Sequence, residues 1–235
     1  TKFDEASDQT LADMLLALHG SPSAPATTAP LRRCPSCGAK DAQLSGGRID
    51  IPKGGTTCPE CGQTIYLGDV LRTEEEYMPE GSNRSSLTRM MLVAERLTSL
   101  GYMQLLFEDP HSFEVLGKTL FITDGPLGLH GTVAPLKRRF QDYLAEFAKQ
   151  CAANKRPAAP LVVGVEKSGT FVEHAHLISH LIEPGYAMLP TTEYINRITG
   201  RPATNPYGSD EFYGRRFIYR SKSGGILVFT VPPKP

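Results

Sequence analysis

Two copies of a C-P-x-C-G motif limit the folds open to this chain more than any other feature of its sequence. They are Cys34-Pro35-Ser36-Cys37-Gly38 and Cys58-Pro59-Glu60-Cys61-Gly62. Each C-x2-C turn brings two thiolates to one side, and two such turns complete a tetrahedral site for Zn²⁺. Residues 31–68 hold few large apolar side chains, so this segment needs a metal in place of a core. We expect a structural zinc ribbon here, with no open coordination position, whose ligands are Cys34, Cys37, Cys58 and Cys61.

Composition excludes several classes of protein. The chain has 235 residues, with 25 Lys+Arg against 25 Asp+Glu, so its whole surface does not attract nucleic acid, although a local basic groove remains open. A hydrophobic fraction of 40% is too high for a disordered chain. No apolar run approaches the roughly 20 residues of a membrane-spanning helix. We expect a globular protein that does not bind membranes.

The sequence shows no secretory signal. This disfavours the alternative that the cysteine motifs form disulfides, and it favours a cytoplasmic location. The sequence starts without Met and stops just after a strand-like run, so we expect a segment of a longer protein.

The sequence predicts three regions. Residues 1–30 contain a short amphipathic helix within 3–19 and then a Pro/Ser/Ala/Thr-rich stretch, 20–30, that is typical of a flexible linker. The zinc ribbon occupies 31–68. Residues 69–235 alternate helices with short apolar strands, which favours an α/β sheet covered by helices on both faces and a hairpin near the end.

A helix is predicted from Ser85 or Ser86 to Leu100, or onward to Asp109. Its apolar face is expected to carry Leu87, Met90, Met91, Ala94 and Leu97. Glu95 lies beside this face. It can pair with Arg96 or Arg89, or it can act as a metal ligand.

Asp124 is the first candidate for a catalytic residue. It closes an apolar strand and precedes Gly125, at the end of the strand where α/β proteins place functional residues. The alternative is an Asp that only begins a turn. Pro126 stands where a phosphoaspartate enzyme would need a second Asp. Lys167 follows the next strand at the same sheet end, where it can neutralise a phosphate or simply be an exposed lysine.

Asp124 and Glu95 together can supply the oxygen ligands that Mg²⁺ or Mn²⁺ prefers for phosphodiester hydrolysis. Basic residues at 137–139 and at 215–216 can contact a phosphate backbone. Aromatic residues that can stack bases interleave with the second cluster: Tyr213, Phe217 and Tyr219. Charge runs of this size are more often solvated faces.

Five segments, taken in order, resemble bacterial NurA-domain proteins with an inserted zinc ribbon. They are CPECGQTIYLGDVLR, EGSNRSSLTRMMLVAERL, LFITDGPLGLHG, LVVGVEKSGTFVEHA and YGSDEFYGRRFIY. The resemblance spans residues 31–231. It implies an RNase H-like mixed sheet flanked by helices, and a DNA nuclease that acts with a HerA-type hexameric ATPase in DNA repair, DNA-end processing or antiphage defence.

The resemblance also implies roles for single residues. Asp124 and Glu95 would bind Mn²⁺ or Mg²⁺, with Glu74, Glu75 or Glu76 as competitors for the second position. Lys167 would be the basic residue of the following strand, and Tyr219 the aromatic residue of the late strand. A homodimer that binds DNA and a HerA ring is the implied assembly.

The sequence departs from the family at two points. The family's first carboxylate lies on an opening strand that ends in Asp-Gly-Ser, and no such strand precedes the zinc ribbon here. Asp50, inside the ribbon, is a poor substitute. The family's late His would fall past Pro235. The rival hypotheses are a non-catalytic adaptor that docks the ATPase or DNA, and an RNA-directed nuclease.

Overall fold

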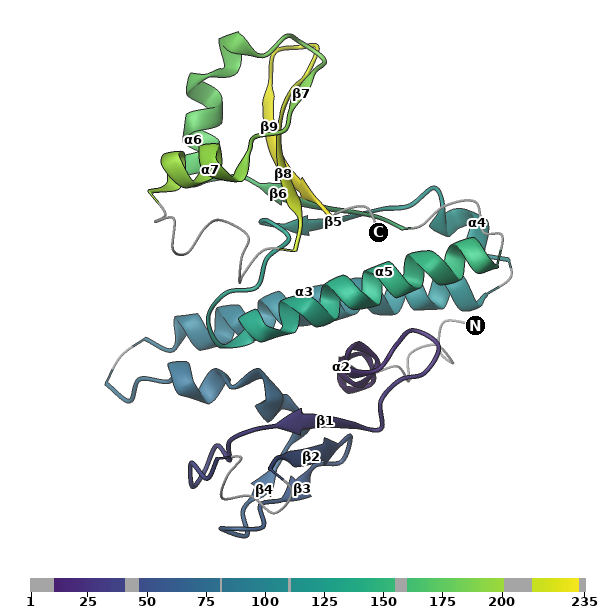
Figure 1. The fold of residues 1–235 in the computed structure, drawn as a ribbon, viewed down its shortest axis with the longest axis vertical. Helices are drawn as coiled ribbons and strands as arrows, with labels where there is room; N and C mark the ends of the chain where they lie inside the picture. Colours follow the sequence, from purple (N-terminus) through teal and green to yellow (C-terminus); the bar gives the residue numbers. More distant parts are fainter. Residues whose placement is uncertain are drawn as a thin grey trace.

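The protein is a mixed α/β structure built around a five-stranded mixed sheet (Figure 1). Its computed structural model describes residues 11–40, 47–80, 82–109, 111–154, 160–200 and 213–232. Residues 3–10 of the expected first helix and the segment YGSDEF at 207–212 lie outside this described part. Within it, no helix combines the length and apolar character needed to cross a bilayer.

The zinc-ribbon segment forms two small antiparallel sheets. β1 (Thr28–Leu31) pairs with β2 (Ile49–Pro52), and β3 (Thr56–Thr57) pairs with β4 (Thr64–Ile65). The prediction of a flexible linker at 20–30 is therefore wrong for residues 28–30, which belong to β1. The side chains of Ala29 and Leu31 point inward, as does that of Ile51 on the neighbouring strand, and all three are almost fully buried. Apolar burial therefore outweighs the flexible composition of this stretch.

Two long helices cross the middle of the molecule (Figure 1). They are α3 (Arg84–Glu108) and α5 (Lys137–Ala153), and the short helix α2 (Leu11–His19) packs against both. The connecting helical turns are η2 (Leu67–Leu71), η3 (Thr73–Glu76), α4 (Phe113–Leu116) and η4 (Gly131–Leu136). The longer of the two predicted ends of α3 is therefore confirmed.

The buried side of α3 differs from the predicted one. Leu87, Met90 and Met91 are exposed. The buried stripe begins later, at Val93, Arg96, Leu97, Leu100 and Met103. The first turns of α3 lie against η3, whose sequence TEEE offers no apolar side chain, so their apolar residues find no core to enter.

The main sheet has the order β5-β6-β9-β8-β7. The strands are β5 (Leu120–Asp124), β6 (Leu161–Glu166), β7 (Ala187–Met188), β8 (Arg215–Arg220) and β9 (Ile226–Val231). β5 and β6 are parallel, and the remaining pairs are antiparallel. Because α5 connects β5 to β6, both strands end at the same sheet edge, and this edge carries Asp124 and Lys167.

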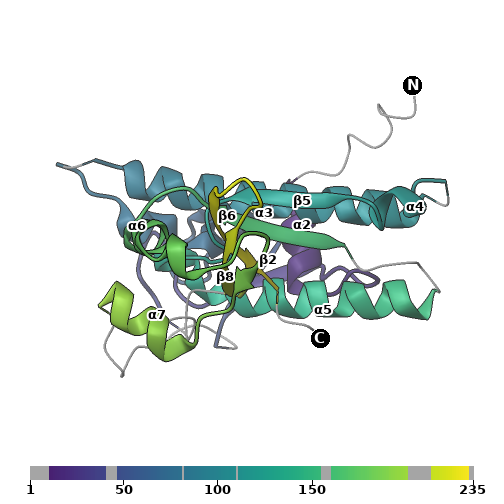
Figure 2. The same ribbon diagram turned by 90° about the horizontal axis from the view of Figure 1, so that it is seen from above.

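In the described part of the chain, helices cover only one face of this sheet. Buried Thr123, Val162 and Val228 point toward the helices, whereas Ile122, Leu161 and Leu227 on the opposite face are exposed. α3 and α5 run below β5 and β6 in Figure 1, and α3 lies behind β5 in Figure 2. The elements α6 (Thr170–Leu177), η5 (Ser179–Leu181) and α7 (Thr192–Thr199) lie beside β8 and β9 in Figure 1. The prediction of cover on both faces is wrong for the described residues.

Candidate functional site

The two cysteine motifs fold into matching turns. In the first, the Cys34 N–H donates to the Ala39 carbonyl at 3.0 Å and the Gly38 N–H to the Cys34 carbonyl at 3.0 Å. In the second, the Cys58 N–H donates to the Gln63 carbonyl at 2.8 Å and the Gly62 N–H to Cys58 at 3.0 Å. Both glycines have positive φ angles, +73° and +70°, which a residue with a β-carbon rarely adopts.

The four thiols converge on one point, as predicted. Their sulfur atoms all lie within 4.8 Å of one another. Two sulfur pairs, Cys34 with Cys61 and Cys37 with Cys58, are each separated by 3.9 Å. Four sulfurs at about 2.3 Å from a tetrahedral Zn²⁺ lie about 3.8 Å apart. The cluster therefore fits a structural metal ion such as zinc, and its four ligands leave no position for a substrate.

The thiols in this cluster compete for negative charge. The backbone N–H of Cys61 lowers the pKa of Cys58 to about 7. The backbone N–H of Gln63 lowers the pKa of Cys61, but lost solvation and the neighbouring thiols outweigh it and raise that pKa to about 12. A cation among the sulfurs would relieve this competition by stabilising all four thiolates.

Asp124 occupies the last position of β5, as predicted, and the turn after it is tightly bonded to its surroundings. The Gly125 N–H donates to the Val165 carbonyl at 2.8 Å, and the Leu127 N–H donates to Oγ1 of Thr230 at 2.7 Å. The Leu127 carbonyl in turn accepts from the Tyr213 N–H at 2.9 Å. These bonds tie the turn to β6, β9 and the segment just before β8.

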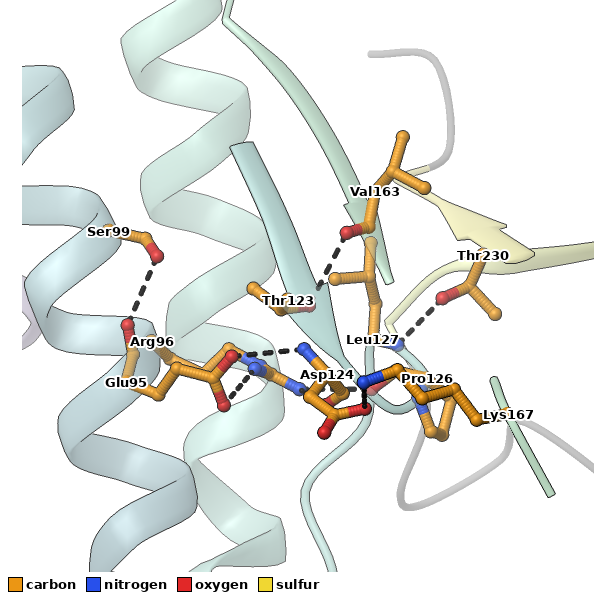
Figure 3. Close-up of polar contacts among 10 residues, drawn as sticks. All are labelled: Glu95, Arg96, Ser99, Thr123, Asp124, Pro126, Leu127, Val163, Lys167 and Thr230. Atoms are coloured by element: carbon orange, nitrogen blue, oxygen red, sulfur yellow. Dashed lines mark hydrogen bonds and ion pairs between the residues drawn. The ribbon is translucent and has the colours of Figure 1, made fainter. Parts of the chain in front are cut away.

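Helix α3 holds the same turn from the covered side of the sheet (Figure 3). Oε1 of Glu95 accepts a hydrogen bond from the Asp124 N–H at 3.0 Å, and Oε2 of Glu95 lies 3.0 Å from Nη1 of Arg96. The predicted pairing of Glu95 with Arg96 is therefore confirmed. Glu95 reaches Asp124 through its backbone, so the two residues lie together as the sequence suggested.

Lys167 also lies beside Asp124. Its Nζ is 3.2 Å from Oδ1 of Asp124 (Figure 3), and both side chains are 70% exposed. The carboxylate and the ammonium thus face solvent while the backbone beneath them is fixed. A rigid support under an exposed charged pair is the arrangement that a site for a charged ligand needs.

Tyr219 lies on the uncovered sheet face but away from Asp124. It is on β8, three strands from β5, which at about 4.8 Å a strand places it roughly 14 Å away. Of the basic and aromatic residues near it, Arg216 and Tyr213 are buried. Arg216 forms a two-bond ion pair with Glu166, with distances of 2.6 and 2.8 Å. These two residues therefore cannot contact DNA as expected.

Two of the three competing glutamates, Glu75 and Glu76, bind other partners. Glu75 binds Arg72 at 2.7 Å, and Glu76 accepts from the Thr132 N–H at 3.1 Å. Asp50, which lies in β2, pairs with Arg48. The helices α3 and α5 lie between β2 and β5 in Figure 1, so they separate Asp50 from Asp124. In this geometry Glu95 is the acidic residue that reaches Asp124.

Sequence reasoning did not identify Arg96 and Thr230 as supports of the site. Arg96 is only 3% exposed and Thr230 is fully buried. A signal for Arg96 was present: it falls on the buried stripe of α3, between Val93 and Leu100, where a charge is costly without a polar partner. Thr230 sits in an apolar strand and gave no such signal.

Comparisons with protein-family models, curated proteins and solved structures found no match for this chain. Within the described ranges, the four cysteines are the one group of three or more side chains suited to a metal. Any functional assignment for Asp124 therefore depends on its own geometry and on the sequence resemblance.

Proposed function

We propose that this chain is a metal-dependent DNA nuclease of the NurA type, with an RNase H-like sheet and a structural zinc ribbon. One observation carries the proposal: an exposed Asp124 carboxylate sits beside Lys167 on a turn that α3, β6 and β9 all hold in place. The sequence resemblance supports DNA as substrate, and also a homodimer and a HerA-type ATPase as partners.

In this proposal the carboxylates and the lysine of the site would have different roles. Asp124 and Glu95 would hold Mn²⁺ or Mg²⁺, since hard cations prefer carboxylate oxygens. The ion would supply Lewis acidity toward the attacking water and the departing oxygen of the phosphodiester. Lys167, which is 70% exposed, would turn from Asp124 toward the phosphate and neutralise its charge. The fixed turn would keep Asp124 in place without reorganisation during the reaction.

A digestion assay tests this proposal. The wild-type chain and Asp124→Asn would be compared on linear, single-stranded and supercoiled DNA in Mn²⁺, in Mg²⁺ and in EDTA. We expect cutting that needs the metal and that falls at least about 100-fold in Asp124→Asn. Asp50→Asn is the matched control, because Asp50 pairs with Arg48 in the ribbon, and its activity should equal that of the wild type. Loss of activity in the control would contradict the assignment of Asp124.

A non-catalytic adaptor is the second candidate. It is favoured by the finding that no third metal-ligating side chain joins Asp124 and Glu95 among the described residues. The same assay separates the two functions when it is repeated with the HerA-type ATPase present. A folded, zinc-loaded chain that binds the ATPase but never cuts DNA would establish the adaptor.

A further inference from the structure

A buried arginine lies directly under the turn that carries Asp124. Nη2 of Arg96 is 3.2 Å from the Pro126 carbonyl oxygen and 3.5 Å from that of Asp124. Its side chain is 3% exposed. The guanidinium therefore contacts the turn from the covered side of the sheet, opposite the solvent that the Asp124 carboxylate faces (Figure 3).

Burial of this charge is costly unless the surroundings compensate it. Glu95 supplies the negative charge, at 3.0 Å, and the two carbonyls supply acceptors. The neighbours of Arg96 on the buried stripe are Val93, Leu97 and Leu100, so an apolar side chain would fill this position without any such cost. What the guanidinium adds at this position is contact with polar groups of the turn and with Glu95.

Arg96 also fixes the second carboxylate of the site. Oε2 of Glu95 pairs with Arg96, while Oε1 accepts the Asp124 N–H at 3.0 Å. One guanidinium thus sets the rotamer of Glu95 and the position of the Asp124 backbone together. The lone pairs that remain on the Glu95 carboxylate then point in fixed directions beside the anchored Asp124 backbone, as a metal site requires.

We propose that Arg96 is the positioning residue of this site: it touches neither the metal nor the DNA, and it holds Asp124 and Glu95 in the geometry that binds the divalent ion. This inference rests on the proposed function. Its chemistry is specific to a guanidinium, because the planar group reaches the carboxylate and the carbonyls at once, whereas a lysine ammonium is a single point charge.

Manganese binding by zinc-loaded variants of the 235-residue chain tests the role. The free Mn²⁺ signal in electron paramagnetic resonance would give the affinity for wild type, Asp124→Asn, Arg96→Met and Arg96→Lys, with cutting of single-stranded DNA measured in parallel. We expect Arg96→Met to bind Mn²⁺ about 10- to 100-fold more weakly than wild type, and Arg96→Lys to recover part of this loss. Arg89→Met is the matched control, since Arg89 lies on the same helix and pairs with Glu76, and its Mn²⁺ affinity should not change.

The outcomes separate the two proposals. A folded Arg96→Met with wild-type Mn²⁺ affinity overturns the positioning role and leaves the nuclease proposal standing, since a merely structural residue would lower the melting temperature alone. If Arg96→Met does not fold, Arg96→Lys decides, because wild-type affinity there overturns the role and weakened affinity supports it. A wild-type chain that binds Mn²⁺ no better than Asp124→Asn and cuts no DNA overturns the proposed function, and the positioning role with it.

Discussion

Gly164 and Gly125 approach each other so closely that a β-carbon on Gly164 would lie 2.6 Å from the Gly125 carbonyl oxygen. The same β-carbon would lie 2.7 Å from the Leu127 nitrogen. The turn that carries Asp124 is therefore packed against bare backbone of β6. Glycine is needed at this position for space, because its φ angle is not in the left-handed region.

We expect Gly164→Ala to destabilise the protein by about 1–3 kcal/mol, as overpacking does. The atoms in the way are backbone atoms of the Asp124 turn and Oγ1 of Thr230, which bonds to that turn, so the variant should also lose Mn²⁺ affinity if the site binds the ion. Urea unfolding measures the first effect. Gly68→Ala is the control, because no atom lies within 4 Å of its added β-carbon, and it should change stability by less than about 0.5 kcal/mol. Equal stability of the two variants would contradict the close approach.

The cysteine cluster predicts a selective effect of single Cys→Ser changes. Cys58→Ser should abolish metal binding and release the two cysteine turns to rapid amide exchange, because the metal is what joins these turns. Cys151→Ser is the control, since Cys151 is buried in α5 outside the cluster. Elemental analysis should find about one zinc per chain in the control and almost none in Cys58→Ser. Retention of zinc by Cys58→Ser would disprove the four-thiol site.

The buried pair of Glu166 and Arg216 predicts a strong asymmetry between single and double variants. Both side chains are less than a tenth exposed, and burial raises the pKa of Glu166 although Arg216 opposes this. Arg216→Met alone should cost about 3–5 kcal/mol, because it leaves a buried carboxylate unpaired, and Glu166→Met with Arg216→Met should recover most of that loss.

Equilibrium unfolding at pH 7 gives these values. Lys149→Met breaks an exposed ion pair with Glu146 and should cost less than about 1 kcal/mol. A double variant as unstable as Arg216→Met would show that the arginine acts through other contacts than Glu166.

Because His19 is partly buried, we expect the protein to lose stability in mild acid. Burial, with Arg139 nearby as a second cause, lowers its pKa from 6.5 to about 4. The unfolded chain therefore takes up a proton below about pH 6.5 while the folded chain does not, so stability falls as the pH drops toward 4 and this contribution is constant below that. The loss should be at most about 3 kcal/mol.

Comparison of the free energies of unfolding at pH 7 and pH 4.5 would detect this contribution of His19 to stability. His19→Leu should show a smaller loss than wild type, and His176→Gln, which changes an exposed histidine, should show the full loss. An identical loss in all three proteins would assign the acid sensitivity to other groups.

Local patterns determined the parts of this protein that depend on near neighbours in the chain. The spacing of Cys34, Cys37, Cys58 and Cys61 identified the four-cysteine cluster, because each turn fixes its own pair of sulfurs. The order of strand, Gly and Pro placed Asp124 at the end of β5, and the intervening helix made β5 and β6 parallel, which brought Lys167 to the same edge. These outcomes follow from local geometry and from the handedness of crossover connections.

Only the tertiary structure decided what supports Asp124 and what faces solvent. Arg96, Gly164 and Thr230 come from three separate elements, and their meeting under one turn depends on strand order and register, which the sequence does not display. The same register turns Arg216 inward to Glu166, and the strand order leaves Tyr219 three strands from Asp124. A one-residue change of register would reverse these faces. Long-range pairing, which no local pattern encodes, therefore selected the residues that build the site.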